Sequence, residues 1–173
     1  MKINMHLLLP AVVIIYFIIV ILFFNNYCTK INRISDMSEL CKMNLDTLLC
    51  NYDNNSVDNM PCLVIYFHPE CNLCGMEIDE LLRYKSKLDN IRLFFISFAS
   101  IAEIKEYILN FPVGQFHYLT IASDIQGDFV NTFEVKSPPM NFLYDRKGKL
   151  VKIHKGIFPY KKLNRCLNKL NCH

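Results

Sequence analysis

The pattern of hydrophobic and polar positions predicts a buried strand that is followed directly by a helix. Residues 62–67 form a short run of apolar side chains rich in β-branched and aromatic types, which is typical of a buried strand, and Pro69 ends it. Between Gly75 and Leu88, apolar residues recur at helical spacing and charged residues occupy the other faces. We therefore expect a strand over 62–67 and a helix over 74–88.

Strands and helices continue to alternate toward the C-terminus. The expected strands lie over 91–98, 118–122, 141–144 and 149–154, and the expected helices lie over 101–110 and 126–133 and from Pro159 onward. The turn residues at 145–148 indicate a hairpin between the last two strands. This order predicts right-handed βαβ units and a hairpin in one mixed sheet. Five aromatic side chains are expected to fill its core: Phe94, Phe95, Phe98, Phe129 and Phe133.

The N-terminal part of the chain has a different pattern. Residues 7–24 are apolar apart from Pro10 and Tyr16 and carry no charge, and a run of about 18 to 20 such residues can span a bilayer. A cleaved signal peptide has a shorter apolar region of about 7 to 15 residues. We therefore expect an uncleaved transmembrane anchor over 7–24, with a short tail over 1–6 before it.

A polar tether and an N-terminal extension are expected over 25–59, and a globular domain over 60–173. Within the extension, residues 39–50 show a weak helical spacing.

Charge and cysteine content indicate where the domain resides. The net charge of +3 is too small and too dispersed to indicate a nucleic-acid partner. Lys2 lies on one side of the apolar run and Lys30 and Arg33 on the other, so the positive-inside rule gives no clear orientation. The chain has eight cysteines, and disulfides persist outside the cytosol. We expect the globular domain to face an extracytoplasmic space, such as a bacterial periplasm or the cell surface.

Two of these cysteines form a Cys-x-x-Cys motif, Cys71 and Cys74, at the junction between the predicted strand and helix. Free N–H groups and the positive end of the helix dipole meet there, and both favour a thiolate. A thiolate is the species that attacks disulfides. The simpler alternatives are a static disulfide or half of a zinc site, but zinc needs two further ligands, and no second close Cys/His pair precedes the C-terminal tail. We expect redox chemistry with neither a metal nor a cofactor.

The remaining cysteines and histidines have simpler expected roles. Cys62 begins the central strand and is expected to be a buried thiol. His68 and His154 are expected to lie on the surface at strand ends. Sequence cannot decide the pairing of the cysteines outside the Cys-x-x-Cys motif, which are Cys28, Cys41, Cys50, Cys62, Cys166 and Cys172.

A second motif, Ser137-Pro138-Pro139-Met140, precedes the strand expected over 141–144. Proline cannot donate to the ladder of a central strand, so two prolines in succession mark the entrance to that strand. An X-Pro bond at this place can be cis, and composition alone does not decide it.

The two motifs together resemble the thioredoxin-like superfamily. Phe67-x-x-x-Cys71-x-x-Cys74 after a buried strand resembles its active site, and residues 135–150 resemble its cis-proline segment. The segment is most similar to the membrane-anchored TlpA/ResA-type branch, which commonly shows Val-x-x-x-Pro-Thr-x-Phe-Leu-Ile-Asp-x-x-Gly-x-Ile there. The resemblance covers about residues 61–170. It implies a thioredoxin-like α/β fold, with a central mixed β-sheet flanked by helices, and the activity of a thiol–disulfide oxidoreductase.

The resemblance also implies roles for single residues. Cys71 would be the attacking thiolate and Cys74 the resolving cysteine. Glu77, where this branch often carries a glutamate, would help to transfer the proton of Cys74, although a glutamate at such a position is more often a solvated helix residue. Pro139 would be the cis-proline next to which a substrate chain binds and which keeps metals off the dithiol, with Pro138 in the same substrate-binding segment.

The partners implied by the resemblance are protein thiols and disulfides together with a membrane electron donor, and the usual direction in this branch is reduction. The sequence departs from the family at three places. Glu70 replaces a tryptophan, Asn72-Leu73 lacks a proline, and Met140 replaces a threonine. A carboxylate next to Cys71 should oppose thiolate formation. These departures leave the redox potential and the choice of partner open.

Three alternatives have weaker support. A peroxiredoxin needs Pro-x-x-x-Thr-x-x-Cys, which the residues before Cys71 do not supply. A copper-delivery protein on this fold uses Cys-x-x-x-Cys with a histidine such as His154, and the spacing here is shorter. A redox-inert interaction module would keep Cys71 and Cys74 in one state at every physiological potential.

Overall fold

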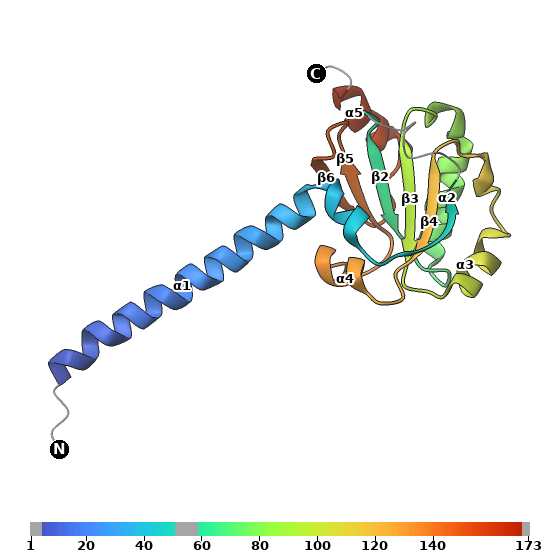
Figure 1. Cartoon of the computed structure of the whole chain (residues 1–173). Coiled ribbons are helices and arrows are strands. Elements are labelled where there is room, and N and C mark those ends of the chain that lie inside the picture. The colour runs from blue at the N-terminus through green and yellow to red at the C-terminus, as the bar shows by residue number, and fades with distance from the viewer. Residues whose placement is uncertain (1–4, 51–58, 171–173) are drawn as a thin grey trace.

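The computed structural model describes residues 5–50 and 59–170 and shows a six-stranded mixed sheet (Figure 1). The strand order is β1-β4-β3-β2-β5-β6. β2 (Cys62–Tyr66), β3 (Arg92–Ser97) and β4 (Leu119–Ser123) are parallel to one another. The hairpin of β5 (Met140–Tyr144) and β6 (Leu150–Lys155) continues the sheet in antiparallel fashion beside β2. The predicted α/β architecture is therefore confirmed.

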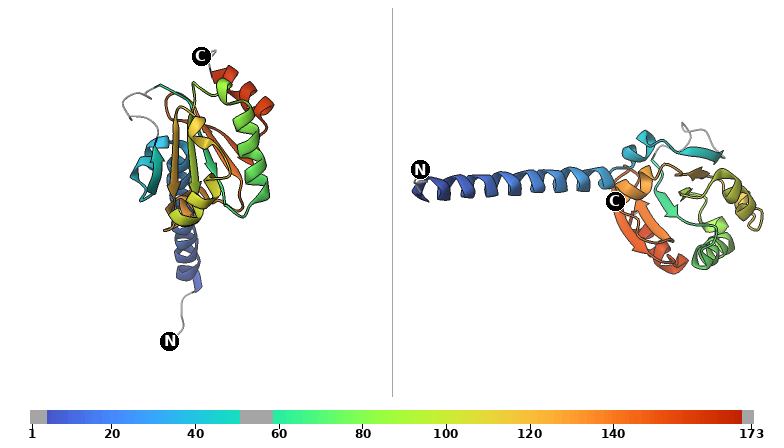
Figure 2. Two further views of the ribbon diagram at one scale, coloured as in Figure 1. Left: turned by 90° about the vertical axis from the view of Figure 1, so that its right-hand side faces the viewer. Right: turned by 90° about the horizontal axis from the view of Figure 1, so that it is seen from below.

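Helices cover both faces of this sheet (Figure 2). One core cluster joins β2 to α2 (Asn72–Arg83), α3 (Ile101–Ile108) and α5 (Tyr160–Leu170), and a second joins it to the 3-10 helix η1 (Met37–Lys42) and to α4 (Asp128–Phe133). The remaining short elements are the 3-10 helices η3 (Lys85–Lys87) and η4 (Val113–Gln115).

The central strand β2 is buried on both faces, which explains why its sequence is continuously apolar. Leu63 and Ile65 belong to the cluster under α2, while Val64 and Tyr66 belong to the cluster on the opposite face. All five residues of the strand are buried. A strand between two neighbours and two layers of helices has no solvent-facing side, so the run predicted over 62–67 needs no polar positions.

The hairpin after β5 also follows from its sequence. Asp145 Oδ1 accepts hydrogen bonds from the N–H groups of Lys147, at 2.8 Å, and Lys149, at 2.9 Å. Gly148 has a φ of +75°, a conformation that glycine adopts without strain. The turn predicted at 145–148 is therefore confirmed.

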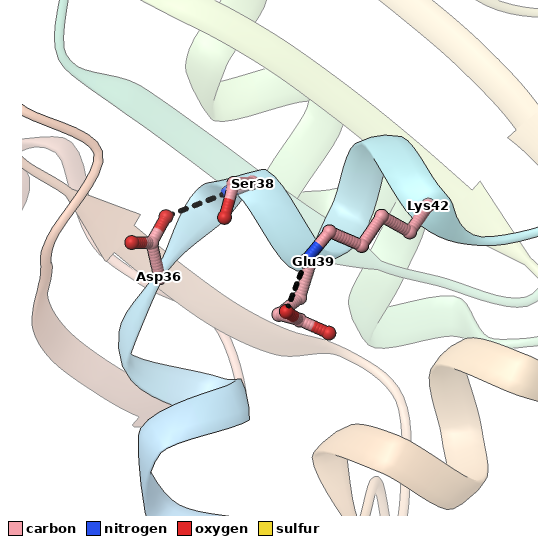
Figure 3. Close-up of polar contacts among 4 residues, drawn as sticks. All are labelled: Asp36, Ser38, Glu39 and Lys42. Carbon is pink, nitrogen blue, oxygen red and sulfur yellow. Dashed lines mark hydrogen bonds and ion pairs between the residues drawn. The ribbon is translucent and has the colours of Figure 1, made fainter.

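The weak helical spacing over 39–50 corresponds to a helix only as far as Lys42, at the end of η1, and residues 46–50 form a strand instead. Asp36 caps η1 by accepting a hydrogen bond from the Ser38 N–H at 2.8 Å, and Lys42 contacts Glu39 at 2.7 Å (Figure 3). The chain then enters β1 (Asp46–Cys50), which pairs with β4 at the edge of the sheet. A weak helical spacing is overridden here because pairing with an existing sheet edge satisfies the backbone of β1.

The helix α1 (Met5–Ser35) extends away from the sheet (Figures 1 and 2). Large apolar side chains of its middle part, between Val12 and Phe24, are 42–74% exposed. The tether expected from residue 25 onward is helical as far as Ser35, since this stretch contains neither proline nor glycine to end the helix.

Within residues 5–50 and 59–170, no helix combines the length and the hydropathy that a membrane crossing requires.

The anchor expected over 7–24 stays a prediction. The tail 1–6 and the extension over 25–59 fall partly on residues outside the described ranges. The side chains of Cys28 and Cys41, and all of Cys172, also lie outside what the structure describes.

Candidate active site

Cys71 and Cys74 lie where β2 passes into α2. Cys71 is the N-cap residue of α2, and its Sγ accepts a hydrogen bond from the Cys74 N–H at 3.3 Å. Neither cysteine forms a disulfide in the structure. Cys71 is half-buried, whereas Cys74 is only 1% exposed. The Cys71 side chain is therefore partly open to solvent, while the Cys74 side chain is enclosed.

The surroundings of Cys74 keep it a neutral thiol. Burial raises the pKa of the Cys74 thiol well above its ordinary value, and its interaction with Cys71 and the nearby Glu77 carboxyl raises it further. A hydrogen bond from the backbone of His68 opposes this rise. A thiol must lose its proton before it attacks a disulfide, so an attack by Cys74 would require a base beside it.

Glu77 supplies a carboxyl group at this place. It lies one turn after Cys74 on α2 and is 1% exposed, and its Oε1 accepts a hydrogen bond from the Phe158 N–H at 2.7 Å. Burial raises the pKa of Glu77 from 4.5 to about 7. The hydrogen bond from the Phe158 N–H and the nearby Asn141 side chain oppose this rise, and the neighbouring Glu80 adds to it. The carboxyl therefore changes its protonation state near neutral pH.

The expectation that Glu77 is a solvated helix residue is wrong. Cys74, Ile78 and Leu81 form the buried stripe of α2, and residue 77 lies on the same face. The helical spacing that identifies the core side of α2 therefore also predicts that the carboxyl group of residue 77 is buried.

The peptide bond between Pro138 and Pro139 is cis, as the resemblance implied. Pro139 is buried, and its carbonyl accepts a hydrogen bond from the Gly156 N–H at 2.9 Å. The next residue, Met140, pairs with Tyr66 at the end of β2. The proline segment and Cys71 therefore lie at the same end of the sheet.

An open cavity of about 390 Å³ lies beside the proline segment. Its walls include Tyr66, Phe98, Asp124 and Pro138. Phe98 is 46% exposed and stacks on His68, with 4.4 Å between ring centroids, so its expected role as a core residue is wrong. Of the other four phenylalanines, Phe95, Phe129 and Phe133 are buried and Phe94 packs against the core. Phe98 follows the end of β3, where the chain turns toward the site.

Sequence reasoning missed two buried polar residues near this end of the sheet. Asp124 is 0% exposed and accepts hydrogen bonds from the N–H groups of Phe129 and Val130, both at 3.0 Å, so it satisfies two backbone donors in the first turn of α4. Asn141 is 0% exposed on β5 and donates to the Gly156 carbonyl at 3.1 Å. Asn141 stands inside the otherwise apolar strand β5, so a polar residue within a strand pattern was the available signal there, whereas Asp124 follows the end of β4 in a polar stretch that gave no such signal.

The other candidate residues occupy less central positions. Glu70 is exposed, and its N–H donates to His68 Nδ1 at 3.2 Å. His154 is half-buried; its Nε2 lies 2.9 Å from the Ile157 carbonyl oxygen and its Nδ1 lies 3.3 Å from Lys162 Nζ. Cys62 is 0% exposed, as expected. Within the described ranges, no group of three or more His, Cys, Asp or Glu side chains is arranged to hold a metal ion.

No protein-family model and no curated protein sequence matches the chain. Solved structures do match it. A putative thiol:disulfide interchange protein DsbE from Chlorobium tepidum has a TM-score of 0.59 at 17% identity, over 73% of this chain and 92% of that one. MTB dsbF has a TM-score of 0.59 at 17% identity, over 72% and 93%. The exposed lipoprotein thioredoxin of Streptococcus pneumoniae has a TM-score of 0.58 at 17% identity, over 72% and 98%.

These similarities define the class of fold: the chain has the thioredoxin-like α/β fold. Within that class, the structures that it resembles carry the names of thiol–disulfide interchange proteins and thioredoxins.

Proposed function

We propose that this protein is a thiol–disulfide oxidoreductase whose redox centre is the pair Cys71 and Cys74. The observation that carries the proposal is the asymmetry of the two sulfurs: a half-buried Cys71 at the N-terminus of α2 and a 1% exposed Cys74 behind it. The cis peptide bond before Pro139 at the same end of the sheet, and the names of the matching structures, support it.

In the reducing direction, the exchange has two steps. The Cys71 thiolate attacks a substrate disulfide, so a Cys71–substrate bond forms, the substrate S–S bond breaks, and one substrate thiolate leaves. Cys74 then gives its proton to the Glu77 carboxylate and attacks Cys71 Sγ. The Cys71–Cys74 disulfide forms and the second substrate thiolate leaves. Two electrons pass to the substrate, and the protein dithiol is oxidised.

Glu77 and the proline segment have separate parts in this proposal. Glu77 is the base for Cys74, since it is buried on the same face of α2 and titrates near neutrality. Pro138 and Pro139 border the route to Cys71, where the extended backbone of a substrate chain would pair. The cavity of about 390 Å³ beside Pro138 gives apolar contact area for that chain.

The location of the protein and the direction of electron transfer are parts of the proposal that depend on the sequence. The uncharged apolar run over 7–24 and the eight cysteines support a membrane-tethered protein with an extracytoplasmic domain. The resemblance to the TlpA/ResA-type branch supports reduction of exported protein disulfides with electrons from a membrane donor.

The test is disulfide exchange by the purified full chain on a model protein disulfide. Cys71→Ser should abolish exchange, and Cys74→Ser should accumulate a mixed disulfide with the substrate at Cys71. Cys166→Ser, which changes a half-buried cysteine on α5, is the control and should leave the rate unchanged. Full activity in Cys71→Ser would refute the proposal.

A further inference from the structure

Two buried oxygen atoms next to the candidate site have no hydrogen-bond partner among the described residues. They are Oε2 of Glu77 and Oδ1 of Asn141. Both side chains are at most 1% exposed. A buried acceptor without a partner is costly, because it has lost water and gained nothing in exchange. A proton on Glu77 Oε2 would turn that oxygen into a donor, and the Asn141 side chain, which also lowers the pKa of Glu77, carries an acceptor oxygen.

Asn141 is fixed by the same segment that fixes Glu77. Its Nδ2 donates to the Gly156 carbonyl at 3.1 Å, and two residues further on the Phe158 N–H donates to Glu77 Oε1 at 2.7 Å. The Gly156 N–H in turn donates to the carbonyl of Pro139 at 2.9 Å. The start of β5, the segment 156–158 and α2 are thereby tied together around the Glu77 carboxyl.

A side-chain amide suits a neighbour that gains and loses a proton. It offers a carbonyl oxygen that accepts and an NH₂ group with two donors, of which one is engaged by Gly156. The Asn141 amide lies near enough to the carboxyl to lower the pKa of Glu77, although it makes no standard hydrogen bond to Oε2. Either form of the carboxyl can therefore find a partner in the same side chain.

We propose that Asn141 is a positioning residue for Glu77. Its amide donates to Oε2 when the carboxyl is charged and accepts from Oε2–H when it is protonated, so that the carboxyl takes the proton of Cys74 without leaving its place. This inference rests on the proposed function, in which Glu77 is the base. The simple alternative is that Asn141 only ties β5 to Gly156.

Besides Asn141, several titratable groups among the described residues lie around the Glu77 carboxyl and can affect its pKa. Cys74 and Glu80 face the carboxyl from α2 itself. On the side of β6 and α5, His154 stacks on Phe158 and lies 3.3 Å from Lys162. The variants below leave all of these residues unchanged.

The first measurement is the titration of Glu77 by carbon NMR in the reduced full chain, which requires no catalysis. Asn141→Leu removes the amide at similar volume and should raise the titration midpoint by about one pH unit, a tenfold change in the acid–base equilibrium. Asn141→Ser, with a smaller side chain that can donate and accept, should shift it less and is the fallback if the leucine variant does not fold. Ser123→Ala is the control: it also removes a buried bond to a carbonyl, Ser123 Oγ to Ala99 at 2.7 Å, and should not move the midpoint.

The second measurement is the rate at which Cys74 resolves the mixed disulfide. At pH 7, a midpoint raised from about 7 to about 8 lowers the charged fraction of Glu77 and should slow resolution about fivefold. In a Glu77→Gln background, Asn141→Leu should have no further effect on this rate or on its pH profile. A purely structural role predicts the same loss in both backgrounds.

The two measurements test the positioning role of Asn141 separately from the proposed oxidoreductase function. An unchanged Glu77 midpoint in a folded Asn141→Leu protein would overturn the positioning role even if exchange is fast. A shifted midpoint in a protein that exchanges no disulfides would support the positioning role and overturn the proposed function.

Discussion

The buried carboxyl of Glu77 predicts how the stability of the protein depends on pH. A glutamate whose pKa is raised in the folded state binds its proton more tightly there than in the unfolded chain. The free energy of unfolding therefore falls as pH rises from about 4.5 to about 7. A rise of the pKa from 4.5 to about 7 corresponds to about 3 kcal/mol, at 1.36 kcal/mol for each pH unit.

Glu77→Gln should remove this dependence. Glutamine keeps an acceptor for the Phe158 N–H and carries no charge, so the variant should gain about 3 kcal/mol relative to the wild type between pH 4 and pH 8. The measurement is urea unfolding of the reduced full chain at pH 4, 5, 6, 7 and 8. Glu106→Gln, which changes an exposed glutamate on α3, is the control and should leave the pH dependence of the wild type unaltered.

The reasoning fails if Glu77→Gln and the wild type show parallel stability curves across this range. Parallel curves would mean that water or a structural change solvates the carboxylate, and the argument for Glu77 as a neutral-pH base would lose its physical support.

Three further substitutions test other parts of the structure. Gly148→Ala should lower the free energy of unfolding by about 1 kcal/mol, because φ is +75° and the added Cβ would lie 3.4 Å from Met37 Cβ; thermal unfolding checks this. Ser100→Ala should cost about 1 kcal/mol by removing the capping box at the start of α3, and an unchanged melting temperature would contradict that role. Phe98→Ala should raise KM for a protein disulfide about fivefold, as expected if the exposed ring contributes about 1 kcal/mol of contact. An equal effect on a small-molecule disulfide would argue against a role of Phe98 in binding a substrate chain.

Much of the fold could be predicted from local sequence. β2 was recognisable because a strand buried on both faces must be apolar throughout, and α2 because Ile78 and Leu81 repeat at helical spacing. The turn before β6 was recognisable because Asp145 and Gly148 have specific backbone roles there. Each of these elements is determined mainly by residues within it.

Elements and roles that depend on distant partners could not be predicted in this way. β1 exists as a strand because it pairs with β4, about seventy residues later in the chain. The partner of Glu77 is the N–H of Phe158, and the partner of Asn141 is the carbonyl of Gly156. The helical spacing placed residue 77 on the core face, yet its chemistry becomes apparent only when the segment 156–158 is packed against it.

The most direct test of the redox proposal is the state of Cys71 and Cys74 in buffers of defined potential. The full chain would be equilibrated with mixtures of reduced and oxidised glutathione, quenched with an alkylating agent, and mapped by mass spectrometry. A two-electron transition that forms a disulfide between Cys71 and Cys74 is the expected result. Two sulfurs that stay reduced at every physiological potential, or a disulfide between either of them and another cysteine, would contradict the account.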